Sequence, residues 1–398
     1  MNDDNTGLTL LGAAVRGTLV GLALAAMFAA GFLVRDLIET PLVRAQGEYP
    51  ILTEVHSLLA QHYVRELPDP VTLEYGAIRG LVGTLNDPHT FFIEPPVAAN
   101  ESDALAGQYG GIGAEVQRDA AGDYVLYPFP DGPAIRAGVQ DGDKLLAVGE
   151  TAVARAMPMD AVQRLLRGDV GDRITIRVQH RDGAVERFEI ELELIEVPSV
   201  LWSTVAEEPA FGYIKLLRFT SRTPDELKQA LAELIDDKRV TALILDVRHN
   251  AGGLLQEAVE VASQFVDGGV ILYEKRRGTD LEPKEAIESG TAADIPMVVL
   301  VDGASASAAE LVAGALRDRG RATLIGQKTY GKGSVQLIFK LADNSSLHVT
   351  SAEWFTPNRT ALDGVGLTPD IEMIPSPDFD AELGEAIRYL REKVAAAQ

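Results

Sequence analysis

The sequence predicts a multidomain protein of mixed α+β and α/β class, in which a transmembrane helix precedes a helical segment, a β-rich module and a layered α/β domain. Three observations support this prediction: an uncharged apolar stretch near the N-terminus, short strand-like runs separated by glycine-rich turns, and alternating strands and helices in the second half. The chain has 398 residues, which is long enough for two or three domains.

The N-terminal apolar stretch predicts a membrane anchor. Residues 17–34, GTLVGLALAAMFAAGFLV, carry no charge and lie between Arg16 and Arg35. A helix of this length spans roughly 27 Å, close to the ~30 Å hydrocarbon core of a bilayer. The alternatives are a buried soluble helix and a cleaved signal peptide, because Val43-Arg44-Ala45 loosely fits a cleavage site. We expect residues 1–47 to form a tail, an uncleaved anchor and a linker.

Three segments follow the anchor. Residues 48–104 read as helical, because ILTEVHSLLAQHYV repeats apolar residues at helical spacing. Residues 105–198 combine short strand-like runs such as RITIRVQH with one helix, MDAVQRLLRG; we call this segment the β module. Residues 199–398 alternate strands such as TALILDV and MVVLV with helices such as AAELVAGALRDR. That alternation predicts a layered α/β domain with parallel strand pairing, closed by a C-terminal helix.

The composition limits the classes of function. A net charge of −23 without a basic stripe argues against nucleic-acid binding. The sequence contains no cysteine, which excludes disulfides and thiolate chemistry. It has neither an HExxH motif nor clustered His and Asp residues, so we expect no metal and no cofactor.

Two serines stand between an expected strand and an expected helix in SASAAE, residues 305–310. The ordinary interpretation of Ser305 or Ser307 is a helix N-cap. A serine at such a turn also exposes its hydroxyl, and the amides of the first helical turn can stabilise an oxyanion. Serine needs a base to act as a nucleophile, but the histidines of the chain fall in no familiar triad motif and GxSxG is absent.

A lysine supplies the alternative base. Lys332 lies between two glycines in GQKTYGKGSVQL and opens a strand-like run. Because side chains alternate along a strand, Lys332, Ser334 and Gln336 would share one face, where Gln336 could hold the amine without adding charge. Burial would lower the pKa of Lys332 and so favour its neutral, basic form. The competing interpretation is an exposed lysine in a turn.

A glycine-rich turn, RHNAGG, follows the strand TALILDV and is either an ordinary strand-to-helix turn or part of an oxyanion site. In the second interpretation an amide of Gly252 or Gly253 approaches the substrate carbonyl together with the amide of Ala308.

The β module contains the glycine-rich stretch YGGIGAEV, which is either a hairpin or a binding loop. As a binding loop, Gly111, Ile112, Gly113 and Ala114 would offer amides to a peptide C-terminal carboxylate, and the next strand would pair with the peptide backbone.

Read together, these motifs resemble the C-terminal processing peptidases, also called tail-specific or carboxyl-terminal proteases, from about residue 49 to the C-terminal helix. GAIRGLVGTLNDPHTFF is similar to the helical segment of that family, and GGIGAEV, GPAIRAGVQDGDKLLAV and GDRITIRV are similar to its PDZ domain. GYIKLLRF, LDVRHNAGGLL, VDGASASAAELVAGALRDRGRATLIGQKTYGKGSVQ and GVGLTPDI are similar to its catalytic domain.

The resemblance implies a Ser–Lys catalytic site. The middle serine of the family pattern S-A-S-A-S-E falls on Ser307, and the GKG-x-x-Q pattern places the base on Lys332 and its supporting amide on Gln336. Ala309 replaces the third serine of the pattern, without loss of a catalytic group. His249 and Ala251 alter the usual glycine turn and leave open whether Gly252 or Gly253 supplies the oxyanion amide.

The resemblance also implies the architecture and the function. It implies a PDZ domain at 105–198 and a crotonase/ClpP-like protease domain at 199–398, both outside the cytoplasm, with a single-pass anchor in the cytoplasmic (inner) membrane and a cytoplasmic tail. The expected function is a serine endopeptidase that cleaves proteins near or from their C-termini, with the PDZ domain gating the site. A homo-oligomer or an adaptor is compatible with this expectation. The alternatives are a catalytically silent PDZ scaffold and a non-proteolytic enzyme on a related crotonase-like fold.

Overall fold

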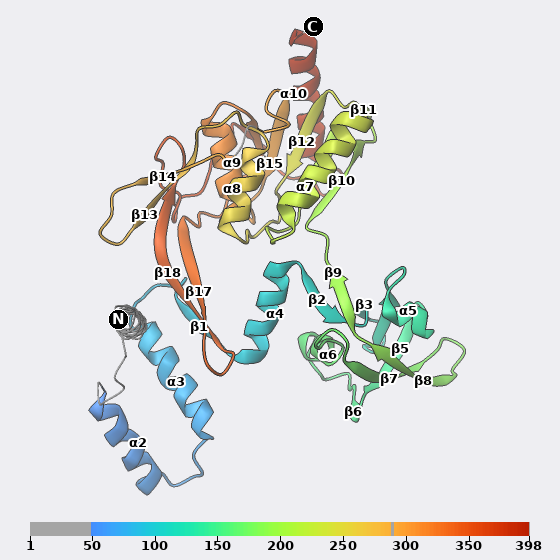
Figure 1. The fold of residues 1–398 in the computed structure, drawn as a ribbon, viewed down its shortest axis with the longest axis vertical. Coiled ribbons are helices and arrows are strands. Elements are labelled where there is room, and N and C mark those ends of the chain that lie inside the picture. Colours follow the sequence, from blue (N-terminus) through green and yellow to red (C-terminus); the bar gives the residue numbers. More distant parts are fainter. Residues whose placement is uncertain (1–48, 288–289, 398) are drawn as a thin grey trace, which may run out of the picture. The chain divides into compact units, whose positions relative to one another are not determined.

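The computed structural model describes residues 49–287 and 290–397 and divides the chain into two compact units, residues 1–73 and 74–398 (Figure 1). Helix α2 (Pro50–His62) lies in the first unit, and α3 (Pro70–Gly83) crosses the boundary. The expected anchor at 17–34 lies outside the described residues. No helix within the described ranges has the length and apolarity needed to span a bilayer.

A six-stranded sheet forms the centre of the α/β domain. In spatial order its strands are β10 (Val200–Val205), β11 (Glu208–Leu216), β12 (Ala242–Asp246), β15 (Met297–Val301), β16 (Thr323–Gly326) and β19 (Ile371–Glu372). The pairings from β11 to β19 are parallel, and β10 is antiparallel to β11. The predicted parallel sheet is therefore confirmed.

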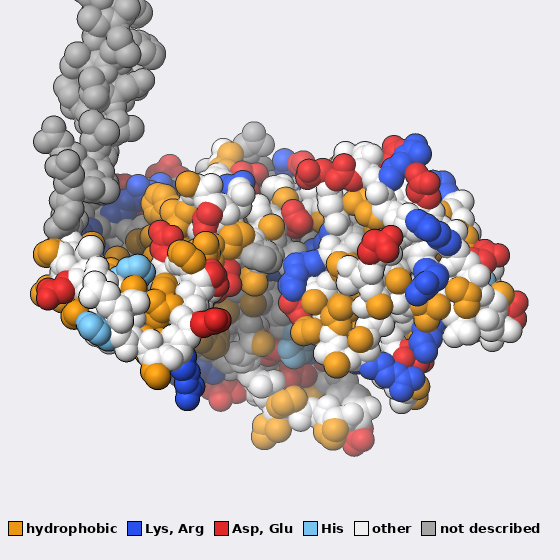
Figure 2. All heavy atoms as spheres, turned by 90° about the horizontal axis from the view of Figure 1, so that it is seen from below, with side chains coloured by type: hydrophobic (Ala, Val, Ile, Leu, Met, Phe, Trp, Pro, Cys, Tyr) orange, Lys and Arg blue, Asp and Glu red, His pale blue; other side chains and the backbone are white. Residues whose placement is uncertain are grey.

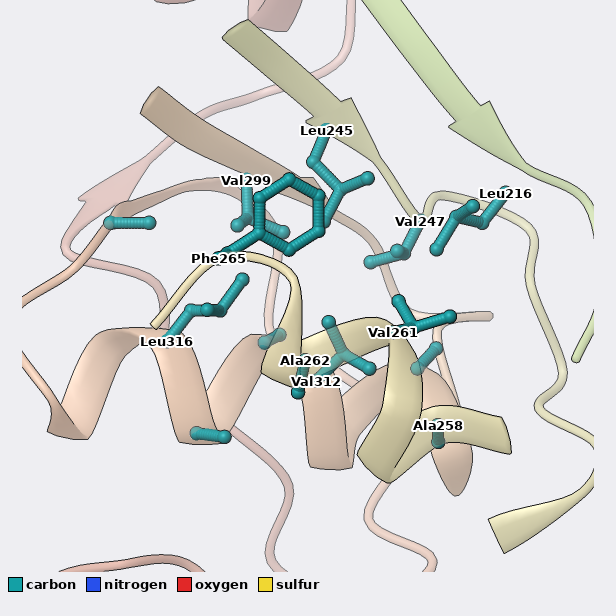
Figure 3. Packing of buried hydrophobic residues seen from close by; sticks show 14 of the residues in the cluster. Leu216, Leu245, Val247, Ala258, Val261, Ala262, Phe265, Val299, Val312 and Leu316 are labelled. Atoms are coloured by element: carbon teal, nitrogen blue, oxygen red, sulfur yellow. The ribbon is translucent and has the colours of Figure 1, made fainter. Parts of the chain in front are cut away.

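Helices cover both faces of this sheet, which gives the domain its layers. Helices α7 (Thr223–Leu231), α8 (Leu255–Ser263) and α9 (Ala308–Asp318) share one apolar cluster with one face, and α10 (Ala381–Ala397) shares another cluster with the opposite face. Alternation along β12 divides its side chains between the two clusters, with Leu245 on the first and Ile244 on the second. In Figure 3, Leu245 packs with Phe265 against the helical layer. Burying each such side chain stabilises the fold by about 1.5–3 kcal/mol.

A second sheet carries the segment that follows Lys332. Its strands are β1 (Phe91–Ile93), β18 (Ser346–Phe355), β13 (Val270–Arg276) and β14 (Glu282–Glu285), with β17 (Ser334–Lys340) also paired to β18. The register of β17 against β18 shifts between Val335 and Gln336. The extra residue at this shift, Ser351, lies in β18 and not in β17.

The β module has its own sheet and its own core. Helix α4 (Pro95–Ala106) leads into β2 (Gln108–Gly111), which pairs with β9 (Glu193–Glu196). The main sheet contains β3 (Ala114–Arg118), β4 (Tyr124–Pro128), β5 (Asp143–Val148), β7 (Arg173–Gln179) and β8 (Val185–Glu191), with β6 (Thr151–Ala152) paired to β5. Two short helices, α5 (Pro133–Ala137) and α6 (Met159–Leu165), complete the module, and α6 is the helix expected from MDAVQRLLRG.

The surface of the molecule carries charges of both signs. On the face shown in Figure 2, Lys and Arg side chains are interspersed with Asp and Glu side chains. The strongly acidic net charge of the chain therefore does not separate into blocks of one sign on this face.

A histidine held between two carboxylates makes the stability of the β module depend on pH. Nδ1 of His180 lies 2.7 Å from Oδ1 of Asp143, and its Nε2 lies 3.5 Å from Oε2 of Glu186. The hydrogen bond to Asp143 raises the pKa of His180 above 6.5. Because the folded-state pKa is raised, this stabilisation is fully present below the unfolded pKa and is lost as the pH rises through the folded pKa.

We therefore expect His180→Gln to weaken the β module more in mild acid than in base. The measurement is the amide hydrogen-exchange protection of β7, compared with the wild-type chain at about pH 6 and about pH 9. Asp143→Asn removes the nearer carboxylate and leaves Glu186, so in that background the effect of His180→Gln on protection should differ less between the two pH values. An equal loss of protection by His180→Gln at both would contradict the ion-pair account.

Candidate active site

The structure separates the two serines of the strand-to-helix turn. Ser305 is fully buried, and its hydroxyl donates to the carbonyl of Val247 at 2.8 Å and accepts from the amide of Asp302 at 2.9 Å. Ser307 is the N-cap of α9 and has φ 55° and ψ −117°, a conformation that non-glycine residues rarely adopt. The hydrogen bonds of Ser305 therefore stabilise the turn. Ser307 instead has a strained backbone conformation of the kind found at functional sites.

A single cavity brings together the residues that the sequence analysis selected from three separate segments. It has a volume of about 210 Å³, and its lining includes Ser307, Lys332, Gln336 and Gly253. Ser307 comes from the turn after β15 and Gly253 from the turn after β12. Lys332 lies just before β17, and Gln336 lies in β17 itself. The expected meeting of these residues at one site is thus present in the fold.

Lys332 is half-buried in this cavity, where its charged form is disfavoured. Burial lowers the pKa of Lys332 below 10.5, and the negative charges of Glu101 and Asp363 act in the opposite direction. Within the described residues, no carboxylate forms a salt bridge with Lys332. Burial therefore shifts the equilibrium of Lys332 toward the neutral amine, which is the direction that a general base requires.

Gln336 lies in the same cavity but does not bond to Lys332 in this structure. Its Nε2 donates to Oγ of Ser334 at 2.9 Å. This contact agrees with the expected alternation, which places Ser334 and Gln336 on one face of the strand. The support of Lys332 by Gln336 remains a prediction.

The glycine turn after β12 has one amide that is already used and one that is free. The amide of Gly252 donates to Oδ1 of Asn250 at 2.8 Å, so it is not the oxyanion donor in this arrangement. The amides of Gly253 and Ala308 have no hydrogen-bond acceptor in the described parts of the chain. A Cβ on Gly252 would lie 2.8 Å from Cβ of Ser307 and 3.1 Å from the amide nitrogen of Ala308, so the two turns touch. The sequence analysis did not decide whether Gly252 or Gly253 supplies the oxyanion amide. In this structure it is the amide of Gly253 that is available to act with that of Ala308.

Asn250, which the sequence analysis did not select, organises this turn. It is fully buried, and its Nδ2 donates to the carbonyl of Leu216 at 2.9 Å. Its own carbonyl accepts from the amide of Ala306, next to the nucleophile turn. An asparagine two residues before a glycine can bond to the backbone in this way, which is the signal that could have identified it.

Gly253→Ala should damage both the stability and the chemistry of the site. Gly253 has φ +147°, and a Cβ there would lie 2.0 Å from the carbonyl oxygen of Phe219, so the turn must move. We expect the hydrolysis rate kcat to fall by about 10²–10³, the typical effect of losing one oxyanion donor. The measurements are kcat and thermal unfolding.

Gly320→Ala is the matched control for the glycine turn, because Gly320 also has a positive φ but has open space around its Cβ position. It should cost only about 1–2 kcal/mol of backbone strain and leave kcat unchanged. Wild-type kcat in Gly253→Ala would contradict the role of this turn.

Two further side chains of the cavity come from elements whose position the sequence did not predict. Glu101, on α4, and His348, on β18, both line the cavity, and Nε2 of His348 lies 2.9 Å from Oε2 of Glu101. The ring of His348 stacks on Phe91 of β1 with 4.5 Å between ring centres. The cavity thus contains a histidine as well as the lysine, and experiments on the base must distinguish them.

The expected carboxylate-binding loop of the β module borders a groove. Ile112, Gly113 and Ala114 line a cavity of about 190 Å³, opposite Leu166 and Arg167. The amide of Ile112 donates to the carbonyl of Leu166 at 3.3 Å, so this amide is not free. Gly111 lies in β2 and forms a bridge with Arg167. Binding of a peptide C-terminus by these four residues remains a prediction.

Comparison with known proteins finds two family models that match parts of the chain. Residues 210–373 match the family model "Peptidase family S41", and residues 124–180 match the model "PDZ domain". The carboxy-terminal-processing protease of Bartonella bacilliformis is 34% identical over 331 residues, which cover 80% of this chain and 75% of that protein. The carboxy-terminal processing protease CtpB of Bacillus subtilis is 31% identical over 335 residues, with 82% and 68% coverage.

A solved structure described as a putative S41 protease from Bacteroides fragilis shares the fold. It superposes with a TM-score of 0.50 at 16% identity and covers 85% of this chain and 97% of its own.

A PDZ domain joined to a peptidase domain with a serine at the head of a buried helix defines a serine-type peptidase. The chain belongs to peptidase family S41, among the C-terminal processing peptidases that carry a PDZ domain. That the protease domain at 199–398 has a crotonase/ClpP-like layered fold remains a prediction.

Proposed function

We propose that the protein is a membrane-anchored serine endopeptidase that cleaves proteins near or from their C-termini, with Ser307 as nucleophile and Lys332 as base. One observation carries the proposal. Ser307 and Lys332, from different segments, line one cavity in which burial favours the neutral amine, beside the free amides of Ala308 and Gly253.

The proposed reaction begins when Oγ of Ser307 attacks the scissile carbonyl carbon and neutral Nζ of Lys332 takes the hydroxyl proton. The amides of Ala308 and Gly253 donate to the oxyanion of the tetrahedral intermediate. As the C–N bond breaks, the ammonium of Lys332 returns the proton to the leaving amine. A water molecule then attacks the acyl carbon while Lys332 accepts its proton. The C–Oγ bond breaks, Lys332 gives that proton to Oγ of Ser307, and the new C-terminus leaves as a carboxylic acid that ionises in water. Gln336 is the neutral side chain that we propose supports Lys332.

We also propose that the PDZ domain captures the apolar C-terminus of the substrate protein. The groove beside β3 is open to an extended chain, and Val116 and Leu166 give it apolar walls. Occupation of this groove would gate the catalytic cavity. Helix α4 offers a direct link, because it carries Glu101 into the cavity and runs into β2 of the PDZ domain.

The membrane topology is part of the proposal. Residues 17–34 would form a single-pass anchor in the cytoplasmic membrane, with both folded domains outside the cytoplasm. Because the chain has no cysteine, Asp182→Cys in an exposed turn gives a single reporter. A membrane-impermeant maleimide should label this variant in intact spheroplasts; labelling only after lysis would place the domains in the cytoplasm.

The test of the function uses the full chain and one reporter protein with three different tails. An apolar tail ending in a free carboxylate should be cleaved. The same tail ending in an amide should be cleaved more slowly, because it lacks the terminal carboxylate. A tail of aspartates should also be cleaved more slowly, because it lacks apolar side chains. Ser307→Ala is the control for contaminating proteases. Equal cleavage of the three tails would refute recognition of the C-terminus, and no cleavage of any would refute the peptidase assignment under these conditions.

A further inference from the structure

Glu310 is a fully buried carboxylate in the first turn of α9, and its hydrogen bonds reach beyond that helix. Its Oε2 accepts from the amide of Ser307 at 2.9 Å and from the amide of Lys332 at 2.8 Å. Two nitrogens that donate to one oxygen can be no farther apart than two hydrogen-bond lengths. This single atom therefore limits the separation between the backbones of the proposed nucleophile and base.

The second oxygen of Glu310 holds the loop that leads to Lys332. Its Oε1 accepts from Oγ1 of Thr329 at 2.5 Å and from the amide of Gly331 at 2.7 Å. A capping-box glutamate needs to bond only to the amide of the N-cap residue, here Ser307. The three other donors come from residues 329–332, so helix capping does not account for the arrangement.

Hydrogen bonds, and no ion pair, hold the carboxylate of Glu310 in place. Among the described residues, no Lys, Arg or His side chain forms a salt bridge with it. Hydrogen bonds to an ionised acceptor are roughly twice as strong as neutral ones, and a buried carboxylate that loses its donors is costly. The turn of Ser307 and the loop of Lys332 are therefore held together by a stiff connection.

We propose that Glu310 is a positioning residue that couples the two catalytic segments, holding the Ser307 turn and the Lys332 loop together so that hydroxyl and amine can meet. The inference rests on the proposed Ser–Lys chemistry. Glu310 itself transfers no proton, because its oxygens are occupied by backbone amides and Thr329.

The first test is Glu310→Gln in the full chain, because glutamine keeps the size of the side chain but replaces one accepting oxygen with a donor. We expect kcat on the apolar-tailed reporter to fall about 10²-fold, the effect of a small misplacement of reacting groups, and KM to stay within about threefold.

The matched control is Glu226→Gln. Glu226 accepts hydrogen bonds from the amide and hydroxyl of Ser199 and from the amide of Val200, in the same domain but outside the cavity lining. The Glu226→Gln variant should have a lower unfolding temperature than the wild-type chain and a kcat within about twofold of the wild-type value. Wild-type kcat in Glu310→Gln would overturn the inference, and so would an equal loss of kcat in both variants.

A double-mutant cycle separates positioning from a general structural role. Hydrolysis of p-nitrophenyl acetate is measured for Glu310→Gln in the wild-type and in the Lys332→Ala background. In the Lys332→Ala background the amine that Glu310 is proposed to align with the Ser307 hydroxyl is missing. Glu310→Gln should therefore lower the rate by less than about threefold in that background. A structural defect would reduce the rate by the same factor in both backgrounds, and that result would overturn the inference. If Lys332→Ala alone keeps the wild-type rate, the proposed Ser–Lys chemistry fails instead, so the two failures are distinguishable.

Thr329 provides a milder test if Glu310→Gln does not fold. Thr329→Val removes the hydroxyl donor to Oε1 of Glu310, and Thr329→Ser keeps it. We expect kcat about tenfold lower in the valine variant and within about twofold of wild type in the serine variant. Wild-type kcat in Thr329→Val would overturn the inference.

Discussion

Replacing Ser307 with alanine should abolish proteolysis and leave the fold intact. Loss of a serine nucleophile typically lowers kcat by roughly 10⁴–10⁶. The change keeps the backbone amide of Ser307 and therefore its hydrogen bond to Glu310. We expect a loss of at most about 1 kcal/mol of stability, the usual cost of replacing an N-cap serine. The measurements are reporter cleavage and the free energy of unfolding.

Ser305→Ala is the matched control for the nucleophile, since it lies two residues earlier in the same turn. Its hydroxyl bonds to the carbonyl of Val247 and the amide of Asp302, so its removal leaves the buried amide of Asp302 without a partner and should cost about 1–3 kcal/mol. Folded Ser305→Ala should still label with a fluorophosphonate, a reagent for activated serines. If Ser307→Ala were active and Ser305→Ala were folded but inactive, the assignment of the nucleophile to Ser307 would be wrong.

Replacing Lys332 should have the second largest effect. Lys332→Ala removes the base and should lower kcat by about 10³-fold or more. Lys332→Arg should be inactive as well, because a guanidinium stays protonated and cannot accept the proton of Ser307. Both variants should keep KM close to wild type where binding precedes slow chemistry.

Lys328→Ala is the control for Lys332, because it removes an exposed lysine from the same loop. It should keep wild-type kcat. If Lys332→Arg were as active as wild type, the lysine would serve only as a positive charge, and the base would have to be sought elsewhere, with His348 the histidine that lines the cavity.

The sequence was a good guide where local chemistry determines structure. TALILDV and MVVLV are buried on both sides and form β12 and β15, as expected for strands between two helical layers. Ser307 was placed correctly at the head of a helix because a strand, a turn of small residues and an apolar helix are all visible in the local pattern. The short strands of the PDZ domain and α6 were likewise confirmed.

The sequence was a poor guide where distant segments meet. Strand β18 pairs with β13 and with β1, and these pairings join residues far apart in the chain, so the second sheet was not expected. The sequence analysis gave Glu310 no role, because nothing local shows that residues 329–332 fold back onto it. Glu101 was missed for the same reason: its place in the cavity depends on how α4 packs.

The central claim is that neutral Lys332 activates Ser307, and the pH dependence of Ser307 labelling by a fluorophosphonate tests it most directly. Labelling should rise with pH through one transition, whose midpoint lies below 10.5 because burial disfavours the ammonium. Glu101→Gln should move that midpoint to lower pH, since it removes a negative charge that favours the ammonium. A transition that disappears in His348→Gln, with Lys332→Arg labelled as fast as wild type, would contradict the account.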